Sequence, residues 1–293
     1  PVVDDAEERT PRLAVIIAAR NEAATIGAQL DALTGQPHPV ATEIIVVDNG
    51  STDATAAIVN ERGARDPRIR LVTANEGSGA AYARNRGAAT TAAEWIAFCD
   101  ADDLVSDGWL AAVCDALGVA AFAAGPMDTT RLNPEWIRGS RGTVFTNDVT
   151  TFEGVFPVAS SCNLAIHRAL FEAHRGFDET FIMGEDTELS MRLFLAGVEM
   201  RFVPDAVVHY RYRSTLRDVF AQSRRFGASF PRVTRRLRAA GVPIETRRRE
   251  AKRWIWLVRS LPTLRSQAGR ARWAWVAGRQ IGVTTSWLRR GRA

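Results

Sequence analysis

The chain has 293 residues, of which 46% are hydrophobic, 24% charged and 8% aromatic. This composition is typical of a folded protein with one large or two smaller domains, and it excludes disordered, collagen-like and disulfide-scaffold proteins. The formal net charge of +5 conceals an uneven distribution. Residues 1–206 hold 16 basic and 30 acidic residues, whereas residues 207–293 hold 22 basic residues and three acidic ones. The sequence therefore predicts an acidic body followed by a basic tail.

Four short apolar runs rich in β-branched residues alternate with helical patterns, which predicts buried parallel strands joined by helices. This pattern is typical of an α/β fold with right-handed crossovers. Ligands of such folds bind beyond the carboxyl ends of the strands, so the informative residues should follow the first, second and fourth strands. The predicted strands are 13–18, 43–48, 69–74 and 94–100, and the helices that follow them are 23–33, 53–62, 78–90 and 107–117.

The pattern is less regular after residue 117. A strand is predicted at 119–125, followed by a loop-rich stretch up to residue 157 of the kind that is mobile or covers a substrate. Helices are predicted at 168–174 and 185–196, short strands at 200–203 and 206–210, and helices after Ser214 with breaks near 241–243, Pro262 and Gly269. The expected parts are a flexible N-terminal tail (1–11), an α/β domain (12–213) and a basic helical extension (214–293).

Three carboxylates follow the fourth predicted strand, at Asp100, Asp102 and Asp103. Carboxylates this close repel one another and are costly to desolvate unless a cation or solvent compensates them. Oxygen ligands of this kind suit Mg²⁺ or Mn²⁺, with phosphates completing the coordination shell. A solvated acidic loop that caps the next helix is the alternative interpretation.

Polar residues also follow the first two strands. Asp48 stands where it could hydrogen-bond a base or a ribose, and a local turn bond is the alternative. The segment Ala19-Arg20-Asn21-Glu22 has the corresponding position after the first strand, where helix initiation by Asn21 is the alternative. After the third strand, the stretch from Asn75 to Gly79 could present backbone N–H groups to an anion, with Arg84 one to two turns into the helix.

Two further features lie later in the chain. Glu185 and Asp186 open a predicted helix, where the helix dipole alone favours acidic residues. Adjacent carboxylates are also what a reaction needs in order to remove a proton from a hydroxyl group. His209, at the end of a short predicted strand, is a candidate metal ligand, although a lone histidine is more often structural.

In this order and spacing, the residues of 12–213 resemble the nucleotide-sugar glycosyltransferases of family 2, which have the GT-A fold, a mostly parallel Rossmann-like sheet flanked by helices. The resemblance implies an inverting, metal-dependent transfer of a sugar from a nucleotide diphosphate sugar to an acceptor hydroxyl in cell-envelope synthesis. Asp186 would be the general base, supported by Glu185, and Mn²⁺ or Mg²⁺ would be bound by Asp102, Asp103 and His209. The implied donor-binding residues are Ala19, Arg20, Asn21, Glu22, Asp48, Asn75, Gly79, Arg84, Asp100, Asp102 and Asp103.

Other functions account for fewer of these residues. A nucleotidyltransferase would be expected to carry a glycine-rich loop with Arg and Lys after the first strand, where this chain has Ala19-Arg20-Asn21-Glu22. A catalytically silent nucleotide-sugar-binding protein would use the same residues without turnover. A nucleic-acid-binding protein would use the basic tail but would leave the acidic clusters without a role, so nucleic acid is not an expected partner.

The tail interleaves tryptophan with arginine, at Trp254, Trp256, Trp273, Trp275 and Trp287. Such helices suit an anionic membrane surface, and packing of the tryptophans on the acidic body is the alternative. Cys99, Cys114 and Cys162 are too widely spaced for a disulfide framework or a zinc site, and no apolar run is long enough to span a membrane. The expected location is therefore the cytoplasm, at the inner face of the cell membrane if the tail binds lipid, with a glycan or lipid-linked acceptor.

Overall fold

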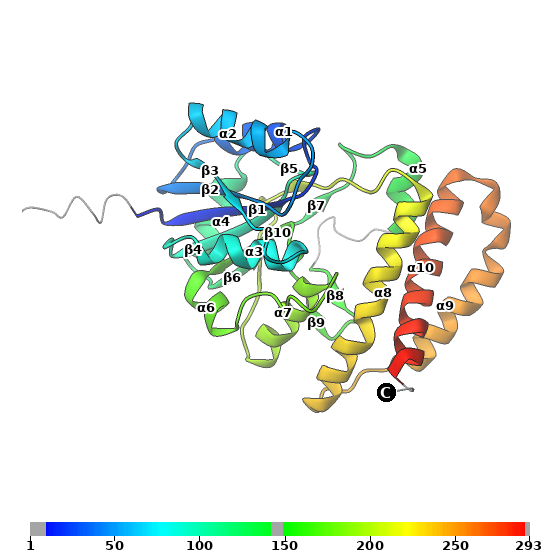
Figure 1. Ribbon diagram of the computed structural model, residues 1–293. Helices are drawn as coiled ribbons and strands as arrows, with labels where there is room; N and C mark the ends of the chain where they lie inside the picture. The colour runs from blue at the N-terminus through cyan, green and yellow to red at the C-terminus, as the bar shows by residue number, and fades with distance from the viewer. Residues whose placement is uncertain (1–9, 142–148, 291–293) are drawn as a thin grey trace, which may run out of the picture.

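The computed structural model describes residues 10–141 and 149–290. Most of the predicted N-terminal tail and part of the predicted loop-rich stretch therefore lie outside the described residues. A central seven-stranded sheet has the order β11-β6-β10-β4-β1-β2-β3 (Figure 1). The strands β1 to β4 pair in parallel, whereas β10 runs antiparallel to β4 and β6. These strands are β1 (Leu13–Ala19), β2 (Thr42–Asp48), β3 (Ile69–Thr73), β4 (Trp95–Asp100), β6 (Phe122–Ala124), β10 (Asn163–His167) and β11 (Arg201–Phe202).

Helices cover both faces of this sheet, which explains why its strands are apolar at successive positions. In β1, the side chains of Leu13, Val15 and Ile17 pack in one buried cluster, and those of Ala14 and Ile16 pack in another on the opposite face. The first cluster includes side chains from α1 (Ile26–Thr34), α2 (Thr55–Arg65) and α4 (Trp109–Leu117), and the second includes α3 (Ala80–Ala89), α6 (Arg168–Ala173) and α7 (Glu185–Leu195).

The strands and helices predicted before residue 214 are confirmed, with boundaries that differ by at most three residues. The predicted break near Gly269 lies slightly earlier, at Ser266, because Gly269 already belongs to the first turn of α10 (Gln267–Arg290). The chain turns there through a short 3₁₀ helix, η3 (Leu261–Arg265), and Ser266 accepts a hydrogen bond from the Gly269 N–H at 3.0 Å. A serine that accepts a bond from the N–H three residues later caps the start of a helix, so this glycine follows a helix start.

The three C-terminal α-helices form a layer beside the body, with α10 between α8 (Leu216–Ala239) and α9 (Arg247–Arg259) (Figure 1). Phe230, Val233 and Leu237 of α8 share a buried cluster with Phe156 and Met191 of the body. At Gly227, Gly278 and Gly282, a backbone oxygen of the facing helix occupies the space that a side chain would need. The backbones of α8 and α10 are therefore in direct contact. The layer is thus packed on the body. The division of the chain into an α/β domain (12–213) and a helical extension (214–293) stays a prediction.

A hairpin of the body also contacts this layer. It consists of β8 (Thr151–Phe152) and β9 (Phe156–Pro157), and its turn residues Glu153 and Gly154 both have positive φ, as in a type I′ turn. The Glu153 carboxylate accepts hydrogen bonds from Arg249 of α9 at 2.8 Å, Arg253 of α9 at 2.9 Å and Arg279 of α10 at 3.2 Å. These bonds join the hairpin to two of the three helices. Among the described helices, none is both long and apolar enough to cross a bilayer.

Candidate functional site

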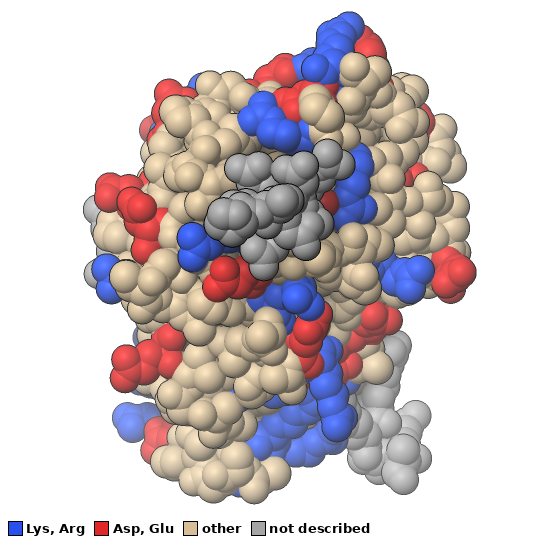
Figure 2. Space-filling model, turned by 90° about the vertical axis from the view of Figure 1, so that its left-hand side faces the viewer, with Lys and Arg blue, Asp and Glu red and all other residues tan. Residues whose placement is uncertain are grey.

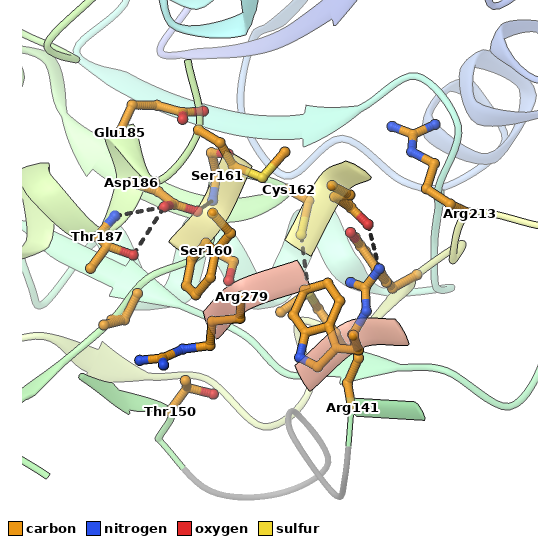
Figure 3. Close-up of a pocket in the computed structure, with 18 of the residues that line it drawn as sticks. Arg141, Thr150, Ser160, Ser161, Cys162, Glu185, Asp186, Thr187, Arg213 and Arg279 are labelled. Atoms are coloured by element: carbon orange, nitrogen blue, oxygen red, sulfur yellow. Dashed lines mark hydrogen bonds between the residues drawn. The ribbon is translucent and has the colours of Figure 1, made fainter. Parts of the chain in front are cut away.

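A cavity of about 660 Å³ lies between the body and the helical layer. One end is lined by carboxylates, namely Asp100 and Asp102 after β4 and Glu185 and Asp186 at the start of α7. The other end is lined by side chains of the C-terminal helices, among them Arg279. Figure 3 shows Glu185 and Asp186 above this space and Arg141 and Arg279 below it. The sequence placed the two carboxylate pairs far apart in the chain, and the fold brings them to one cavity.

Asp100 and the residues after it form the most acidic part of the site. The side chain of Asp103 is almost wholly buried, and its Oδ1 accepts a hydrogen bond from the Arg211 N–H at 2.7 Å, while its Oδ2 has no partner within the described residues. Burial and the charge of Asp100 raise the pKa of Asp102 to about 6 and raise that of Asp103 well above its usual range. The negative charge of these groups is therefore under-compensated, as at a cation site.

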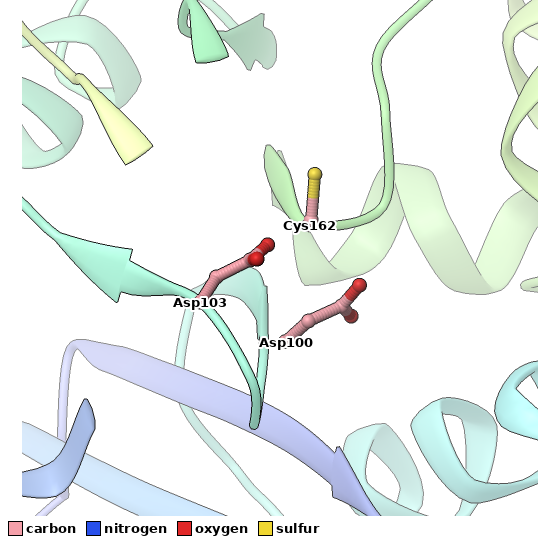
Figure 4. Close-up of side chains that lie close together, drawn as sticks. All are labelled: Asp100, Asp103 and Cys162. Atoms are coloured by element: carbon pink, nitrogen blue, oxygen red, sulfur yellow. The ribbon is translucent and has the colours of Figure 1, made fainter. Parts of the chain in front are cut away.

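The donor set fits a hard divalent cation. One ligand atom each from Asp100, Asp103 and Cys162 lies within 4.8 Å of the other two (Figure 4). Burial raises the pKa of the Cys162 thiol well above its usual range, and its Sγ lies 3.0 Å from Met127 Sδ, so it offers a neutral sulfur. Carboxylate oxygens, and not thiols, suit Mg²⁺ and Mn²⁺. The aspartates of this group fit the predicted cation, and the cysteine adds nothing to that fit.

Two of the three predicted metal ligands lie outside this group. Asp102 forms an ion pair with Arg213 at 3.2 Å. His209 lies in β12 (Val208–His209), opposite Leu104 of β5 (Leu104–Val105), and its Nδ1 donates a hydrogen bond to Asp128 at 2.7 Å. A carboxylate on one ring nitrogen is the usual arrangement of metal-binding histidines, since it leaves the other nitrogen for the ion. The ligand roles of Asp102 and His209 stay predictions.

Arg84, one of the predicted donor-binding residues, connects the two acidic pairs. It is only 4% exposed, its Nη2 donates to Asp100 at 2.6 Å, and its Nη1 donates to Glu185 at 2.7 Å. Arg84 belongs to α3, whose small residues Ala81, Ala83 and Ala88 pack on the sheet and bring the helix close to β1. One guanidinium thus fixes the distance between the end of β4 and the start of α7.

Asp186 is held by backbone N–H groups. Its Oδ1 accepts from the Thr187 N–H at 2.6 Å and its Oδ2 from the Ser161 N–H at 3.2 Å, and the side chain faces the cavity (Figure 3). Gly184, just before the helix, has φ = 83° and lies against Ser229 of α8, where a side chain would collide. Burial raises the pKa of Asp186, which makes the carboxylate a stronger base than an exposed aspartate.

The donor-binding residues predicted after the first three strands, from Ala19 to Gly79, lie together at the carboxyl edge of β1 to β3, and these do not line the cavity. Asn21 has φ = 58° and its Oδ1 accepts from the Thr52 N–H at 2.8 Å, while the Glu22 N–H donates to Thr55 at 2.8 Å. Asp48 accepts a long bond from the Ser51 N–H at 3.3 Å, so the local turn bond is present. Arg20, Asn75 and Gly79 are exposed at the same edge. The donor roles of these residues stay predictions.

The opposite end of the cavity combines arginines with aromatic rings. The Arg141 guanidinium lies 4.1 Å from the ring centre of Trp275 and 4.3 Å from that of Tyr212. Arg272 lies over the Trp256 ring at 5.3 Å. Of the predicted tail tryptophans, Trp256 and Trp275 therefore line the cavity, in line with packing on the body, whereas Trp254 and Trp287 are exposed.

The chain matches two known families. The family described as "Glycosyl transferase family 2" matches residues 14–175, and "Glycosyl transferase family group 2" matches residues 95–290. The chain belongs to glycosyl transferase family 2. The predicted family is thus confirmed, and the second match continues through α8, α9 and α10.

Several curated proteins resemble the chain. Glycosyltransferase AglE of Haloferax volcanii is 29% identical over 206 residues, which are 67% of this chain and 66% of AglE. The probable glycosyltransferase YdaM of Bacillus subtilis is 31% identical over 67% of this chain and 50% of its own length. Pre-mycofactocin glycosyltransferase of Mycobacterium tuberculosis is 29% identical over 73% and 46%, respectively. The chain therefore spans from about half to two thirds of the length of these family 2 relatives.

Solved structures support the same fold. A mannosyltransferase from Pyrobaculum calidifontis in complex with GDP-Man and Mn²⁺ superimposes with a TM-score of 0.63 at 18% identity, over 95% of this chain and 87% of that one. TarS of S. aureus superimposes with a TM-score of 0.53 at 18% identity, over 96% and 92%. At this identity the likeness concerns the fold, and the predicted GT-A fold is confirmed.

Sequence reasoning missed several residues that shape this family 2 site. The Asn49 side chain donates to the Gly77 carbonyl and accepts from the Gly79 N–H, both at 2.9 Å, so it holds the loop before α3. Arg211 donates through its side chain to the Asp102 carbonyl at 2.9 Å, and thereby holds the acidic turn. The position of Asn49 directly after a strand is a signal in the sequence that could have identified it. No such signal identifies Arg141 and Arg279, since only packing brings them to the cavity.

Proposed function

We propose that the protein transfers a sugar from a nucleotide diphosphate sugar to an acceptor hydroxyl, with inversion, in the synthesis of a cell-envelope glycan or glycolipid. The observation that carries this proposal is the shared cavity, in which a base held by two backbone N–H groups, Asp186, lies with the carboxylates after β4. The glycosyltransferase relatives support it, as does the structural neighbour in complex with GDP-Man and Mn²⁺.

In the proposed reaction, Asp186 takes the proton of the acceptor hydroxyl as its oxygen attacks the anomeric carbon. The bond from that carbon to the diphosphate breaks, and its electron pair leaves with the nucleoside diphosphate. Asp102 and Asp103, with Asp100 and His209, would hold Mn²⁺ or Mg²⁺, which when bound supplies charge neutralisation at the diphosphate. Arg84 holds Glu185 and Asp100 and so keeps the base and the donor side at a fixed separation.

The arginine and aromatic end of the cavity is our candidate acceptor site. It lies in the same cavity as Asp186, and its lining comes from helices beyond the donor-side strand ends. Aromatic rings such as Trp256 and Trp275 offer flat apolar surfaces to a sugar ring or an apolar chain. Arginine forks such as Arg272 suit phosphate or carboxylate groups. A glycan or a lipid-linked acceptor with an anionic group fits these features.

A turnover screen tests the function. UDP-sugars and GDP-sugars would be incubated with the protein and Mn²⁺, and released nucleoside diphosphate would be measured with and without candidate acceptors. For the sugar that is used, Asp186→Asn should lower the transfer rate by about 10²- to 10⁴-fold. Its affinity for the nucleotide, measured by calorimetry, should stay within a few-fold of wild type.

The matched control is Asp205→Asn, which neutralises an exposed aspartate outside the cavity lining. It should transfer sugar at the wild-type rate. An unchanged rate in Asp186→Asn would remove the base assignment. Binding of nucleotide sugars without turnover of any of them would identify a silent binding protein instead.

A further inference from the structure

Helix α9 exposes a continuous apolar stripe. Ala251, Trp254, Ile255 and Val258 have the spacing i, i+3, i+4 and i+7, which places them on one side of a helix. Trp254 is 44% exposed, Ile255 52% and Val258 67%. Leu261, at the start of η3, continues the exposed apolar surface. In an ordinary surface helix such a stripe faces the protein core, so an exposed one calls for a covering partner.

The other side of α9 already has its protein partners. Arg253 and Trp256 line the cavity, Leu257 is buried, and the Trp273 ring N–H of α10 donates to the Leu257 carbonyl at 3.1 Å. In Figure 1, α9 is the outermost helix of the layer, on the side away from the central sheet. The stripe is therefore a second, separate apolar surface of a helix whose first surface is satisfied.

Basic residues border the stripe. Arg248, Lys252 and Arg259 are exposed along one edge of α9, and Arg265 and Arg270 follow in η3 and α10. None of these five forms an ion pair with any residue of the described ranges 10–141 and 149–290. The only acidic residue of α9 and α10, Glu250, is bound by Arg253 and Arg279. Figure 2 views the opposite side of the molecule, where acidic and basic side chains are interspersed.

We propose that the exposed stripe of α9, with Leu261 and the bordering basic residues, docks on an anionic lipid bilayer. An aromatic ring at headgroup depth, aliphatic side chains just below it and cations at the lipid phosphates are the features of a helix that lies in a membrane interface. A nucleic acid would match the cations but would leave Ile255 and Val258 in water. An acidic protein would also match the cations, but no feature of the described residues indicates such a partner. Bilayer docking goes beyond the proposed function and does not depend on it.

The docking would also bring the cavity close to the lipid. Arg253 and Trp256 line the cavity from the same helix whose other side carries Trp254 and Ile255. The diameter of a helix with its side chains is about 10 to 12 Å. The cavity wall would therefore lie about one helix diameter from the bilayer, within reach of an acceptor anchored in it.

Vesicle co-sedimentation of the full chain tests the proposal. The probes are vesicles of phosphatidylcholine alone and of phosphatidylcholine with about one third phosphatidylglycerol. Wild type should sediment with the anionic vesicles and much less with the neutral ones. The variant Trp254→Ser/Ile255→Ser/Val258→Ser should lose at least tenfold in the bound-to-free ratio, and so should Arg248→Gln/Lys252→Gln/Arg259→Gln. Added salt should weaken wild-type binding, because screening acts on the cationic contribution.

The body offers matched controls. Val119→Ser/Leu195→Ser removes exposed apolar side chains, and Arg86→Gln/Arg131→Gln/Arg201→Gln removes three exposed arginines, all far from α9 in the sequence. Both controls should bind vesicles like wild type, and circular dichroism should report wild-type helix content for every variant. Equal sedimentation of wild type and the α9 serine variant would overturn the proposal. So would wild-type binding to duplex DNA or to a second copy, measured by ultracentrifugation, without binding to anionic vesicles.

Discussion

The two ends of the cavity are built in different ways. The acidic end comes from residues that directly follow a strand or open a helix, such as Asp100 and Asp186, so each carboxylate pair is local in the sequence. The opposite end comes from Arg141 of the body and from Trp275 and Arg279 of α10, which meet only when α10 packs on the body. The proposed chemistry thus depends on the sheet, whereas the proposed acceptor site depends on the helical layer.

The two ends also differ in their charge balance. Burial and mutual repulsion raise the pKa of Asp102 to about 6 at the acidic end. At the other end, burial and the charge of Arg253 lower the pKa of Arg279, while Glu250 and Glu153 oppose that shift. At the acidic end, Arg84 and Arg213 form ion pairs with three of the carboxylates, but Asp103 has no ion pair within the described residues. The basic end supplies internal carboxylates for its own buried arginine. A ligand is therefore more necessary to the balance of the acidic end.

The largest effect is expected where the two acidic pairs are joined. Arg84→Met leaves the buried Glu185 and the partly exposed Asp100 without their shared cation, and it should lower the free energy of unfolding by about 3 to 5 kcal/mol in urea titrations. Arg84→Lys keeps a positive charge, but a lysine cannot bond both carboxylates at once. Its free energy of unfolding should therefore lie between those of wild type and Arg84→Met. The control Arg86→Met, exposed on the same helix, should stay within about 0.5 kcal/mol of wild type. Equal stability of Arg84→Met and wild type would contradict the structural role of this contact.

The junction between hairpin and helices comes next. Burial alone would raise the pKa of Glu153, but bonds and charges from Arg249, Arg253 and Arg279 lower it overall. Its stabilising contribution is therefore present above its unfolded pKa of about 4.5 and is lost as the pH falls through the lower folded value. Glu153→Gln should cost about 2 kcal/mol at pH 7, and the difference in Tm from wild type should shrink in acid. A difference that persists unchanged at about pH 2 would show that the charge is not its cause.

The metal assignment can be sharpened by comparing single ligands. Asp103→Asn and Asp102→Asn should each lower Mn²⁺-dependent affinity for a nucleoside diphosphate by at least about tenfold in calorimetry. His209→Ala should do the same if its ring nitrogen binds the ion. A wild-type affinity in His209→Ala alone would leave the histidine as a structural partner of Asp128.

A smaller effect is expected at the acceptor end. Trp275→Ala removes the ring that lies against the Arg141 guanidinium, and it should raise the KM for the acceptor by about tenfold. The affinity for the donor nucleotide should not change, because the ring lies at the other end of the cavity. A matching loss of donor affinity would mean that the two ends do not have separate ligands.

The pH dependence gives the smallest effect. Since burial raises the pKa of Asp186, its conjugate acid persists to higher pH than that of an ordinary aspartate. The base must be deprotonated, so kcat/KM should fall as the pH decreases through a pKa that lies above that of an ordinary aspartate. The residual activity of Asp186→Asn should lack this acid limb. An identical limb in that variant would assign it to another group.

Much of the sheet could be predicted, because strands buried on both faces are apolar at every position. The runs that became β1 and β2 have this pattern, and the carboxylates after β4 could be assigned to its ligand-binding edge from strand order alone. Arg84 shows the limit of such reasoning, because its position in a helix beside the donor was predictable but its two carboxylate partners come from β4 and from α7, about 100 residues later. The helical wall could not be predicted, since the tail pattern gives the faces of its helices but not what they pack against.

The glycines between α8 and α10 set one dimension of the cavity. Gly227, Gly278 and Gly282 let two helix backbones touch, and Trp275 and Arg279 project from the same stretch of α10. A single methyl group at any of the three positions would push α10 outward and carry both cavity-lining side chains with it. In the proposed acceptor site, the size of the acceptor that fits would therefore be controlled by glycines outside the cavity lining, and a change of acceptor range could arise without any substitution in that lining.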